Sequence, residues 1–220
     1  MIKAVIFDMD GTLVDTEPIY HKTNSELYKY LCLNINQTEN ESFVGIDSKK
    51  KWSYIKEKGK LSHPLKDLIA LSKKYKIAAL GKTRIPVFKG ITTLIEELIN
   101  REIKIALASS SNWEIINLNL KSTGLDKYFK YKVSGEDIKN GKPAPDIFLA
   151  TANLISCQAN ECMVIEDSKN GVLGALAAGM TCIAHNVVNS NQDLDMAHLV
   201  IDSYSPVNRK KIFSLIDKSI

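Results

Sequence analysis

Two acidic residues, Asp8 and Asp10, directly follow an apolar segment near the start of the chain, in the sequence IFDMDGT of residues 6–12. The apolar segment predicts a buried strand, and ligands of parallel α/β sheets gather at the carboxyl ends of strands. If the backbone stays extended, both carboxylates point the same way before Gly11 lets the chain turn. A buried carboxylate pair needs a cation or a shared proton, and those are the conditions for metal binding and general acid catalysis. An ordinary acidic turn is the alternative interpretation, which the apolar strand directly before it weakens.

A second acidic pair, Glu166 and Asp167, ends another predicted strand at residues 162–166. Carboxylates at neighbouring strand ends can converge on one hard cation, and Mg²⁺ takes a few protein oxygens while keeping waters and phosphate oxygens as other ligands. Asp167 is also well placed to be the N-cap of the following helix. The two interpretations are compatible.

Ser109 and Lys142 follow two further predicted strands, at residues 103–108 and 131–134. Small hydroxyl residues before the N-terminus of a helix form an anion site, although one of the serines at 109–111 could simply cap the helix. Lys142 lies beside two prolines that stiffen its loop and would fix a cation in place, although an ordinary surface lysine in a loop is the alternative.

These four motifs supply a nucleophile and acid, an anion donor, a cation and metal-binding carboxylates. Together they describe phosphoryl transfer, in which Mg²⁺ and a lysine offset the repulsion between an attacking carboxylate and a phosphate. A nucleotide P-loop is excluded, because five residues separate Gly135 and Gly141 where four are needed, and Pro143 stands at the Ser/Thr position.

Short apolar runs alternate with longer stretches of helical period outside residues 18–86. This alternation predicts an α/β fold with a doubly wound, Rossmann-like parallel sheet, covered by helices on both faces. The expected strands are residues 2–7, 103–108, 131–134, 162–166, 181–184 and 199–202, and the expected helices are 91–101, 113–123, 145–155, 169–178 and 206–220.

Residues 18–86 show only helical periodicities, near 18–33, 49–58 and 64–80, and carry 14 basic against 6 acidic residues. We therefore expect an all-α helical cap at 18–86, inserted into a catalytic core of residues 1–17 and 87–220. Two crossings between the domains would form a natural hinge.

In order and spacing, residues 8–12, Ser109, residues 142–148 and residues 165–172 resemble the four motifs of the haloacid dehalogenase-like hydrolases. The likeness is to the branch that contains β-phosphoglucomutase and many sugar-phosphate phosphatases. It implies that Asp8 attacks phosphorus and forms an aspartyl-phosphate, while Asp10 protonates the leaving oxygen and then activates the acceptor.

The resemblance also implies the remaining site residues. Mg²⁺ would be held by the Asp8 side chain, the Asp10 backbone carbonyl and Asp167, with Glu166 in support. Ser109 and Lys142 would bind the transferring phosphoryl group. The basic insert would be the family's helical cap, which closes over the site and selects the substrate.

Hydrolysis and mutase activity differ only in whether water or a sugar hydroxyl accepts the phosphoryl group. β-Phosphoglucomutase resembles this chain in the core, but its cap presents a histidine and an arginine; here His21 is displaced by one residue, and Ser48 falls at the arginine position with Lys49 beside it. We therefore predict a phosphatase, with His21 and Lys49 as candidate substrate contacts. The alternatives are a β-phosphoglucomutase-type mutase and, more remotely, a non-catalytic phosphosugar-binding protein.

Composition places the 220-residue chain among globular proteins, with 45% apolar and 25% charged residues and a net charge of +4. The run Lys49–Lys51 is typical of a solvated helix face, so no nucleic-acid partner is expected. Four cysteines without a C-x-x-C pair predict reduced thiols and no zinc site. With no signal peptide and no apolar run near 18 residues, we expect a cytoplasmic monomer without a membrane partner that acts on a small phosphorylated metabolite.

Overall fold

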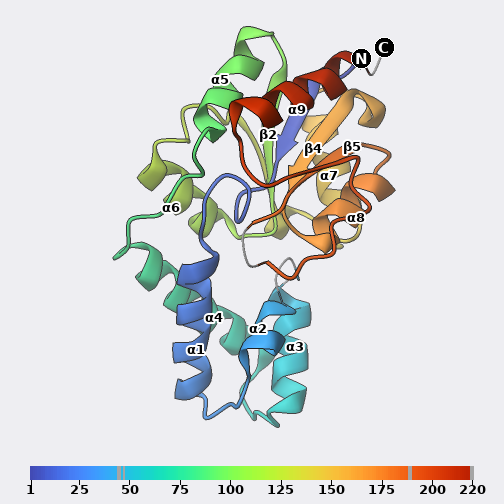
Figure 1. Cartoon of the computed structure of the whole chain (residues 1–220). Coiled ribbons are helices and arrows are strands. Elements are labelled where there is room, and N and C mark those ends of the chain that lie inside the picture. Colours follow the sequence, from blue (N-terminus) through green and yellow to red (C-terminus); the bar gives the residue numbers. More distant parts are fainter. Residues whose placement is uncertain (44–45, 47, 188–189, 219–220) are drawn as a thin grey trace.

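The computed structural model describes residues 1–43, 46, 48–187 and 190–218 and contains a six-stranded sheet (Figure 1). The strand order is β3-β2-β1-β4-β5-β6, and every neighbouring pair is parallel. The strands are β1 (Ala4–Phe7), β2 (Lys104–Ser109), β3 (Tyr131–Ser134), β4 (Cys162–Glu166), β5 (Thr181–His185) and β6 (Leu199–Ile201). The chain moves outward from β1 to β3 and then returns to the other side of β1, so the topological switch point lies between β1 and β4.

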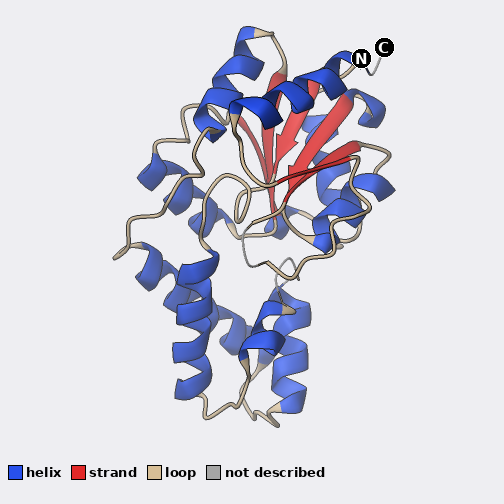
Figure 2. Cartoon of the chain, viewed as in Figure 1, coloured by secondary structure: helices blue, strands red, loops and turns tan. Residues whose placement is uncertain are grey.

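Helices pack on both faces of this sheet (Figure 2), as the predicted doubly wound fold requires. They are α5 (Ile91–Asn100), α6 (Trp113–Thr123), α7 (Asp146–Leu154), α8 (Lys169–Ala177) and α9 (Pro206–Lys218). Val5 and Phe7 pack in one apolar cluster with α5, α6 and α9, whereas Ala4 and Ile6 pack in another with α7 and α8. Since successive strand residues point to opposite faces, continuous apolar strands are what a sheet buried on both sides needs.

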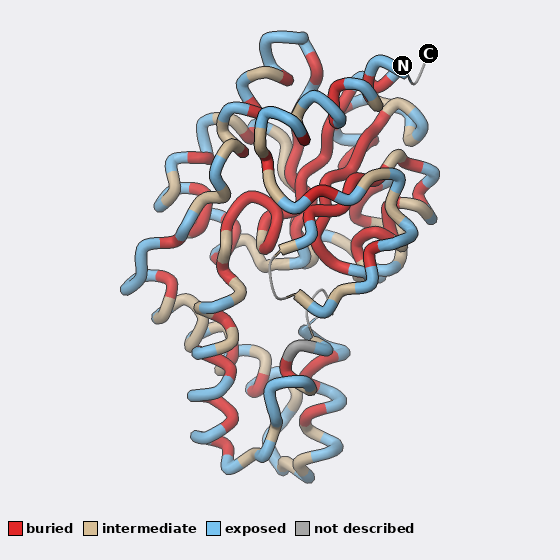
Figure 3. Tube along the Cα trace, in the orientation of Figure 1, coloured by how far each residue is buried: buried red, intermediate tan, exposed pale blue. Residues whose placement is uncertain are grey.

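Four helices stand apart from the sheet and have their own apolar centre. They are α1 (Glu17–Tyr30), α2 (Gln37–Glu41), α3 (Ser48–Lys58) and α4 (Leu65–Leu80). Their helical faces bury Leu27, Trp52, Ile55 and Leu68 against one another, and the buried stripes alternate with exposed ones in Figure 3. We refer to α1–α4 as the cap.

The helix α2 was not expected from periodicity, because it is only five residues long. The side chain of Asn36 begins it by accepting a hydrogen bond of 2.9 Å from the Glu39 backbone N–H. Gly45 and Asp47, which shortly precede the candidate residue Lys49 in the sequence, lie outside the described residues.

The two segments that connect the cap to the sheet run side by side. The backbone N–H of Asp15 donates to the Pro86 carbonyl over 2.9 Å, and that of Phe88 donates to the Leu13 carbonyl over 3.1 Å. Both connections therefore converge at one place beside the loop after β1. Within the described part of the chain, no helix is both long and apolar enough to cross a membrane.

Candidate active site

Lys142 joins the ends of the two central strands through a buried ion-pair network. Its ammonium donates to Asp8 Oδ1 and to Glu166 Oε1, both over 2.6 Å, and to the Ala108 carbonyl over 3.3 Å. Only 3% of Lys142 is exposed, so it is not the surface lysine that its loop position would also allow. Burial lowers the pKa of Lys142, but the two carboxylates outweigh burial and raise this pKa above its ordinary value.

Asp167 adds a third carboxylate, and ligand oxygens of Asp8, Glu166 and Asp167 lie within 4.8 Å of one another. Burial raises the pKa of Asp8 to about 8, because the opposing effect of Lys142 is outweighed by burial together with the neighbouring carboxylates. Burial, followed by the neighbouring carboxylates, raises the pKa of Asp167 well above its ordinary value. With all three ionised and Lys142 charged, the cluster carries two excess negative charges. This charge, together with the all-oxygen donor set, fits a divalent hard cation such as Mg²⁺.

The absence of a side chain at Gly11 leaves space for the Asp167 carboxyl group. Gly11 adopts a φ of +80°, and a Cβ built on it would lie 2.0 Å from Asp167 Oδ2. A side chain at this position is therefore excluded both by backbone conformation and by space. The turn that follows Asp10 packs directly against the third carboxylate.

Glu166 uses both carboxyl oxygens in protein contacts. While Oε1 accepts from Lys142, Oε2 accepts from the backbone N–H groups of Asp167 and Ser168, each over 2.8 Å. Ser168, not Asp167, is the N-cap of α8, because its Oγ accepts from the Gly171 backbone N–H. The Asp167 carboxylate is therefore not used as the helix cap and lines the cavity. Glu166 instead holds the Lys142 ammonium through its ion pair.

Asp10 faces the same cavity as Asp8 but is held by different partners. Its carboxylate accepts hydrogen bonds from Thr16 Oγ1 over 2.6 Å and from Ser111 Oγ over 2.9 Å. Asp10 thus sits between the first cap connection and the loop after β2. It is separate from the Lys142 network, which suits a proton-transfer group distinct from the nucleophile.

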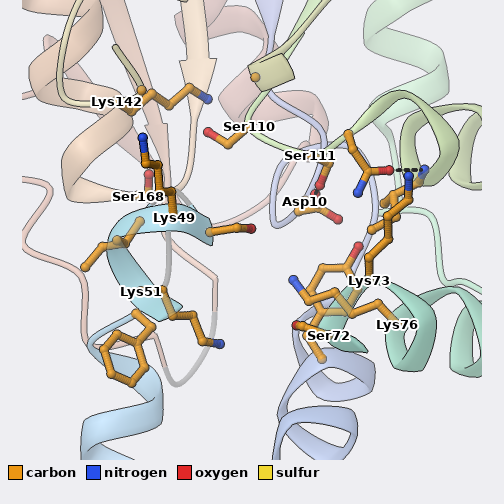
Figure 4. Close-up of a pocket in the computed structure, with 18 of the residues that line it drawn as sticks. Asp10, Lys49, Lys51, Ser72, Lys73, Lys76, Ser110, Ser111, Lys142 and Ser168 are labelled. Carbon is orange, nitrogen blue, oxygen red and sulfur yellow. Dashed lines mark hydrogen bonds between the residues drawn. The ribbon is translucent and has the colours of Figure 1, made fainter. Parts of the chain in front are cut away.

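Ser109, the expected phosphate contact, is the last residue of β2 and is buried. Its Oγ accepts a hydrogen bond of 3.1 Å from the Ser111 backbone N–H. Ser110, Ser111 and Asn112 line the cavity at this point, with the two serines labelled in Figure 4, and Asn112 is also the N-cap of α6. The loop of residues 109–111 thus reaches the site, and Ser109 stabilises it through the hydrogen bond from the Ser111 backbone.

A cavity of about 510 Å³ lies between these core residues and the cap. His21 and Lys49, the two expected cap contacts, both line it. His21 Nδ1 is 2.8 Å from Asn40 Nδ2, and its Nε2 is 3.7 Å from Glu17 Oε2. This volume lies within the range of about 300–1,000 Å³ that is common for small-molecule sites.

The description of Lys49–Lys51 as one solvated helix face is wrong for Lys51. Lys49 and Lys50 are exposed, but Lys51 is only 8% exposed and lines the cavity with Lys76 of α4. Both of these inward-facing lysines were missed in the sequence. A run of three lysines cannot show which of them the cap will enclose.

The haloacid dehalogenase-like hydrolase family matches residues 5–185, a span that contains the central strands, the cap and all the carboxylates described above. The chain belongs to this family. The expected family and fold are therefore confirmed.

Several individual proteins resemble this hydrolase. The Phosphorylated carbohydrates phosphatase of Thermotoga maritima is 30% identical over 195 residues, which cover 87% of this chain and 88% of that protein. The β-phosphoglucomutase of Clostridium difficile has a similar crystal structure, with a TM-score of 0.87, 27% identity and coverage of 99% and 98%. The chloroplastic protein SUPPRESSOR OF QUENCHING 1 of Arabidopsis thaliana is 32% identical over 188 residues, but the match spans 83% of this chain and only 18% of that much longer protein.

Proposed function

We propose that this hydrolase releases phosphate from a sugar phosphate or a similarly small phosphate monoester, through an aspartyl-phosphate at Asp8 and with Mg²⁺ as cofactor. The observation that carries the proposal is the buried Asp8–Lys142–Glu166 network beside Asp167, at the core end of a cavity that the cap covers. The similarity to a carbohydrate-phosphate phosphatase and to a β-phosphoglucomutase supports this substrate class.

In the first step, an Asp8 carboxylate oxygen attacks phosphorus, and the bond from phosphorus to the sugar oxygen breaks. Asp10 gives a proton to that leaving oxygen, so the sugar departs as a neutral alcohol. Water then attacks the aspartyl-phosphate while Asp10 takes up one of its protons, which returns Asp8 as a carboxylate and releases phosphate. Lys142 binds the phosphoryl oxygens, and the Ser110–Ser111 loop borders the same space.

Asp8 and Asp167 would hold Mg²⁺ with the Asp10 backbone carbonyl, and Glu166 would support the site through Lys142. When bound, this ion supplies charge neutralisation and orientation for the phosphate. We expect Mg²⁺ to raise the melting temperature of the wild-type protein and to have a much smaller effect on Asp167→Asn. Differential scanning fluorimetry over a Mg²⁺ titration measures both, and an equal response of the two proteins would contradict the assignment of Asp167.

A mutase is the second candidate, because the core also resembles a β-phosphoglucomutase. The cap of this chain places His21 and Lys49 around the cavity, without an arginine among its described lining residues. Lysine offers a point charge in place of the bidentate fork of arginine, which favours water over the hydroxyl of a sugar monophosphate as acceptor of the phosphoryl group.

The deciding experiment is a Mg²⁺-dependent screen of phosphorylated sugars that measures free phosphate and isomer formation together. We expect phosphate release to dominate, and removal of Mg²⁺ by a chelator to stop it reversibly. Faster formation of glucose 6-phosphate from β-glucose 1-phosphate with a trace of the 1,6-bisphosphate would favour the mutase. No phosphate release from any substrate, p-nitrophenyl phosphate included, would favour the binding protein. The domain boundaries at 17/18 and 86/87, the cytoplasmic location and the monomeric state stay predictions.

A further inference from the structure

Three successive carbonyl groups of the loop after β1 accept hydrogen bonds from donors outside that loop. The bonds run from His185 Nδ1 to the Gly11 carbonyl over 2.8 Å, from the Tyr204 hydroxyl to the Thr12 carbonyl over 3.0 Å, and from the Phe88 backbone N–H to the Leu13 carbonyl over 3.1 Å. Residues 11–14 are buried, so these carbonyls depend on protein donors in place of water. The position of the loop is therefore set by its three donors.

The three donor residues also pack on one another. The centre of the His185 ring lies 4.6 Å from that of Phe88 and 4.7 Å from that of Tyr204, so His185 is the middle ring of the three. They come from distant parts of the sequence: the connection that returns from the cap, the carboxyl end of β5 and the segment before α9. Because His185 contacts both of the other rings, a change at this residue would affect all three contacts with the loop.

The hydrogen bond from His185 is a contact between neutral groups. A carbonyl only accepts, so Nδ1 of His185 carries the proton that Gly11 receives. Burial lowers the pKa of His185 below its ordinary value, which keeps the ring uncharged at neutral pH. An uncharged amide N–H at the same place would therefore satisfy the Gly11 carbonyl equally well.

Tyr204 donates from a backbone that is itself closely packed. Gly90 has a φ of +89°, and a Cβ built on it would lie 2.3 Å from the Tyr204 carbonyl oxygen. The same carbonyl accepts a hydrogen bond of 2.9 Å from Arg209 Nη1 of α9. The tyrosine hydroxyl is thus held from a fixed segment, as a group that orients another residue must be.

The loop that these donors hold is in contact with the carboxylates of the site. Its first residue, Asp8, donates its backbone N–H to the Ile165 carbonyl over 3.0 Å, which fixes the start of the loop to β4. Three residues later, Gly11 packs directly against the Asp167 carboxyl group. A displacement of the Gly11 carbonyl would therefore shift the loop against Asp167 and change the direction of the Asp8 carboxylate.

We propose that His185 is a positioning residue for the attacking carboxylate of Asp8, with Tyr204 as the second anchor of the same loop. Neither residue is among the described residues that line the cavity, so both would act through the loop and not on the substrate. A displacement of about 1 Å at a reacting group can lower a rate by about 10²-fold. The proposal rests on the proposed function, because it takes Asp8 as the nucleophile.

The test compares His185→Leu, which removes the donor, with His185→Asn, which keeps an uncharged N–H donor at a similar place. With p-nitrophenyl phosphate and saturating Mg²⁺, we expect His185→Leu to lower kcat by about tenfold or more with little change in KM. His185→Asn should recover most of this loss. Tyr204→Phe, which removes one oxygen and keeps the ring, should lower kcat by a smaller factor.

Inhibition supplies a readout that a purely structural role would not change. Orthovanadate forms a five-coordinate complex that resembles the transition state of phosphoryl transfer, whereas phosphate is the product. We expect His185→Leu to weaken inhibition by vanadate by about the same factor as kcat, and to leave inhibition by phosphate unchanged. His198→Leu is the matched control and should change none of these quantities, because His198 Nδ1 accepts from the Cys182 backbone N–H near the other end of β5.

Equal losses of kcat in both His185 variants, a loss confined to KM, or equal losses of vanadate and phosphate inhibition would overturn the proposal. If His185→Leu does not fold, Tyr204→Phe decides, and an unchanged kcat in that variant would also overturn it. Failure of the proposed function is distinguishable, because it appears as wild-type protein that releases no phosphate from p-nitrophenyl phosphate.

Discussion

Asp8→Asn should reduce turnover of any phosphate monoester by at least about 10⁴-fold, because an amide cannot replace the attacking carboxylate. Phosphate release from p-nitrophenyl phosphate measures this loss. Acid-quenched wild-type enzyme should carry a phosphorylated aspartate that intact-protein mass spectrometry detects, and the variant should carry none. Unchanged kinetics in Asp8→Asn would refute the mechanism.

The same variant should fold at least as well as the wild type when no metal is present. The amide oxygen still accepts from Lys142, and one negative charge leaves a cluster in which burial and like charges raise the pKa of Asp8 to about 8. Asp15→Asn is the matched control, since Asp15 lies in the same loop but does not line the cavity. We expect this control to retain turnover, and a loss as large as that of Asp8→Asn would show that any change in the loop is sufficient.

The convergence of Asp8, Glu166 and Lys142 could be predicted because it follows from parallel topology. Residues that end adjacent parallel strands meet at one edge of the sheet, and short continuous apolar runs identify those strands from local sequence alone. The register of β1 with β4, which pairs Phe7 with Ile165, then brings the two acidic strand ends side by side. Lys142 reaches the same edge from the loop after β3.

The contributions of the cap were harder to predict, because they depend on how separate helices enclose one another. Lys49, Lys50 and Lys51 have the same chemistry in the sequence, and only the packing of Tyr28 and Phe43 around one of them makes it a cavity residue. The phosphate contact of Ser109 stays a prediction, because Ser109 is not among the described residues that line the cavity. Two residues of turn after β2 decide which serine side chain faces the cavity.

The position of His185 in the sequence indicates a functional role, but His185 was not among the predicted site residues. It ends β5 directly after a buried apolar run, in the same kind of position that identified Asp8 and Glu166. A polar residue at a strand end contacts either a ligand or the loop that holds one. Distinguishing the two requires the distance to Gly11, which no pattern in the sequence contains.

Lys142→Met should lower both the free energy of unfolding and kcat, because Lys142 forms ion pairs with two buried carboxylates at once. Removing one partner of a buried ion pair leaves charge uncompensated, so the free energy of unfolding should fall by about 3–5 kcal/mol. Loss of the cation beside the phosphoryl group should also lower kcat by about 10²–10³-fold. Urea denaturation in metal-free buffer measures the first effect, and p-nitrophenyl phosphate turnover measures the second.

The two effects of Lys142 can be separated by removing one of its carboxylate partners. In the double variant Lys142→Met/Glu166→Gln one negative charge disappears with the positive one, so part of the lost stability should return. Turnover should not return, since the double variant still lacks a cation at the phosphoryl site. If Lys142→Met instead unfolds at the same urea concentration as the wild type, the buried network contributes nothing to folding; if the double variant recovers turnover, the role of Lys142 is only to neutralise Glu166.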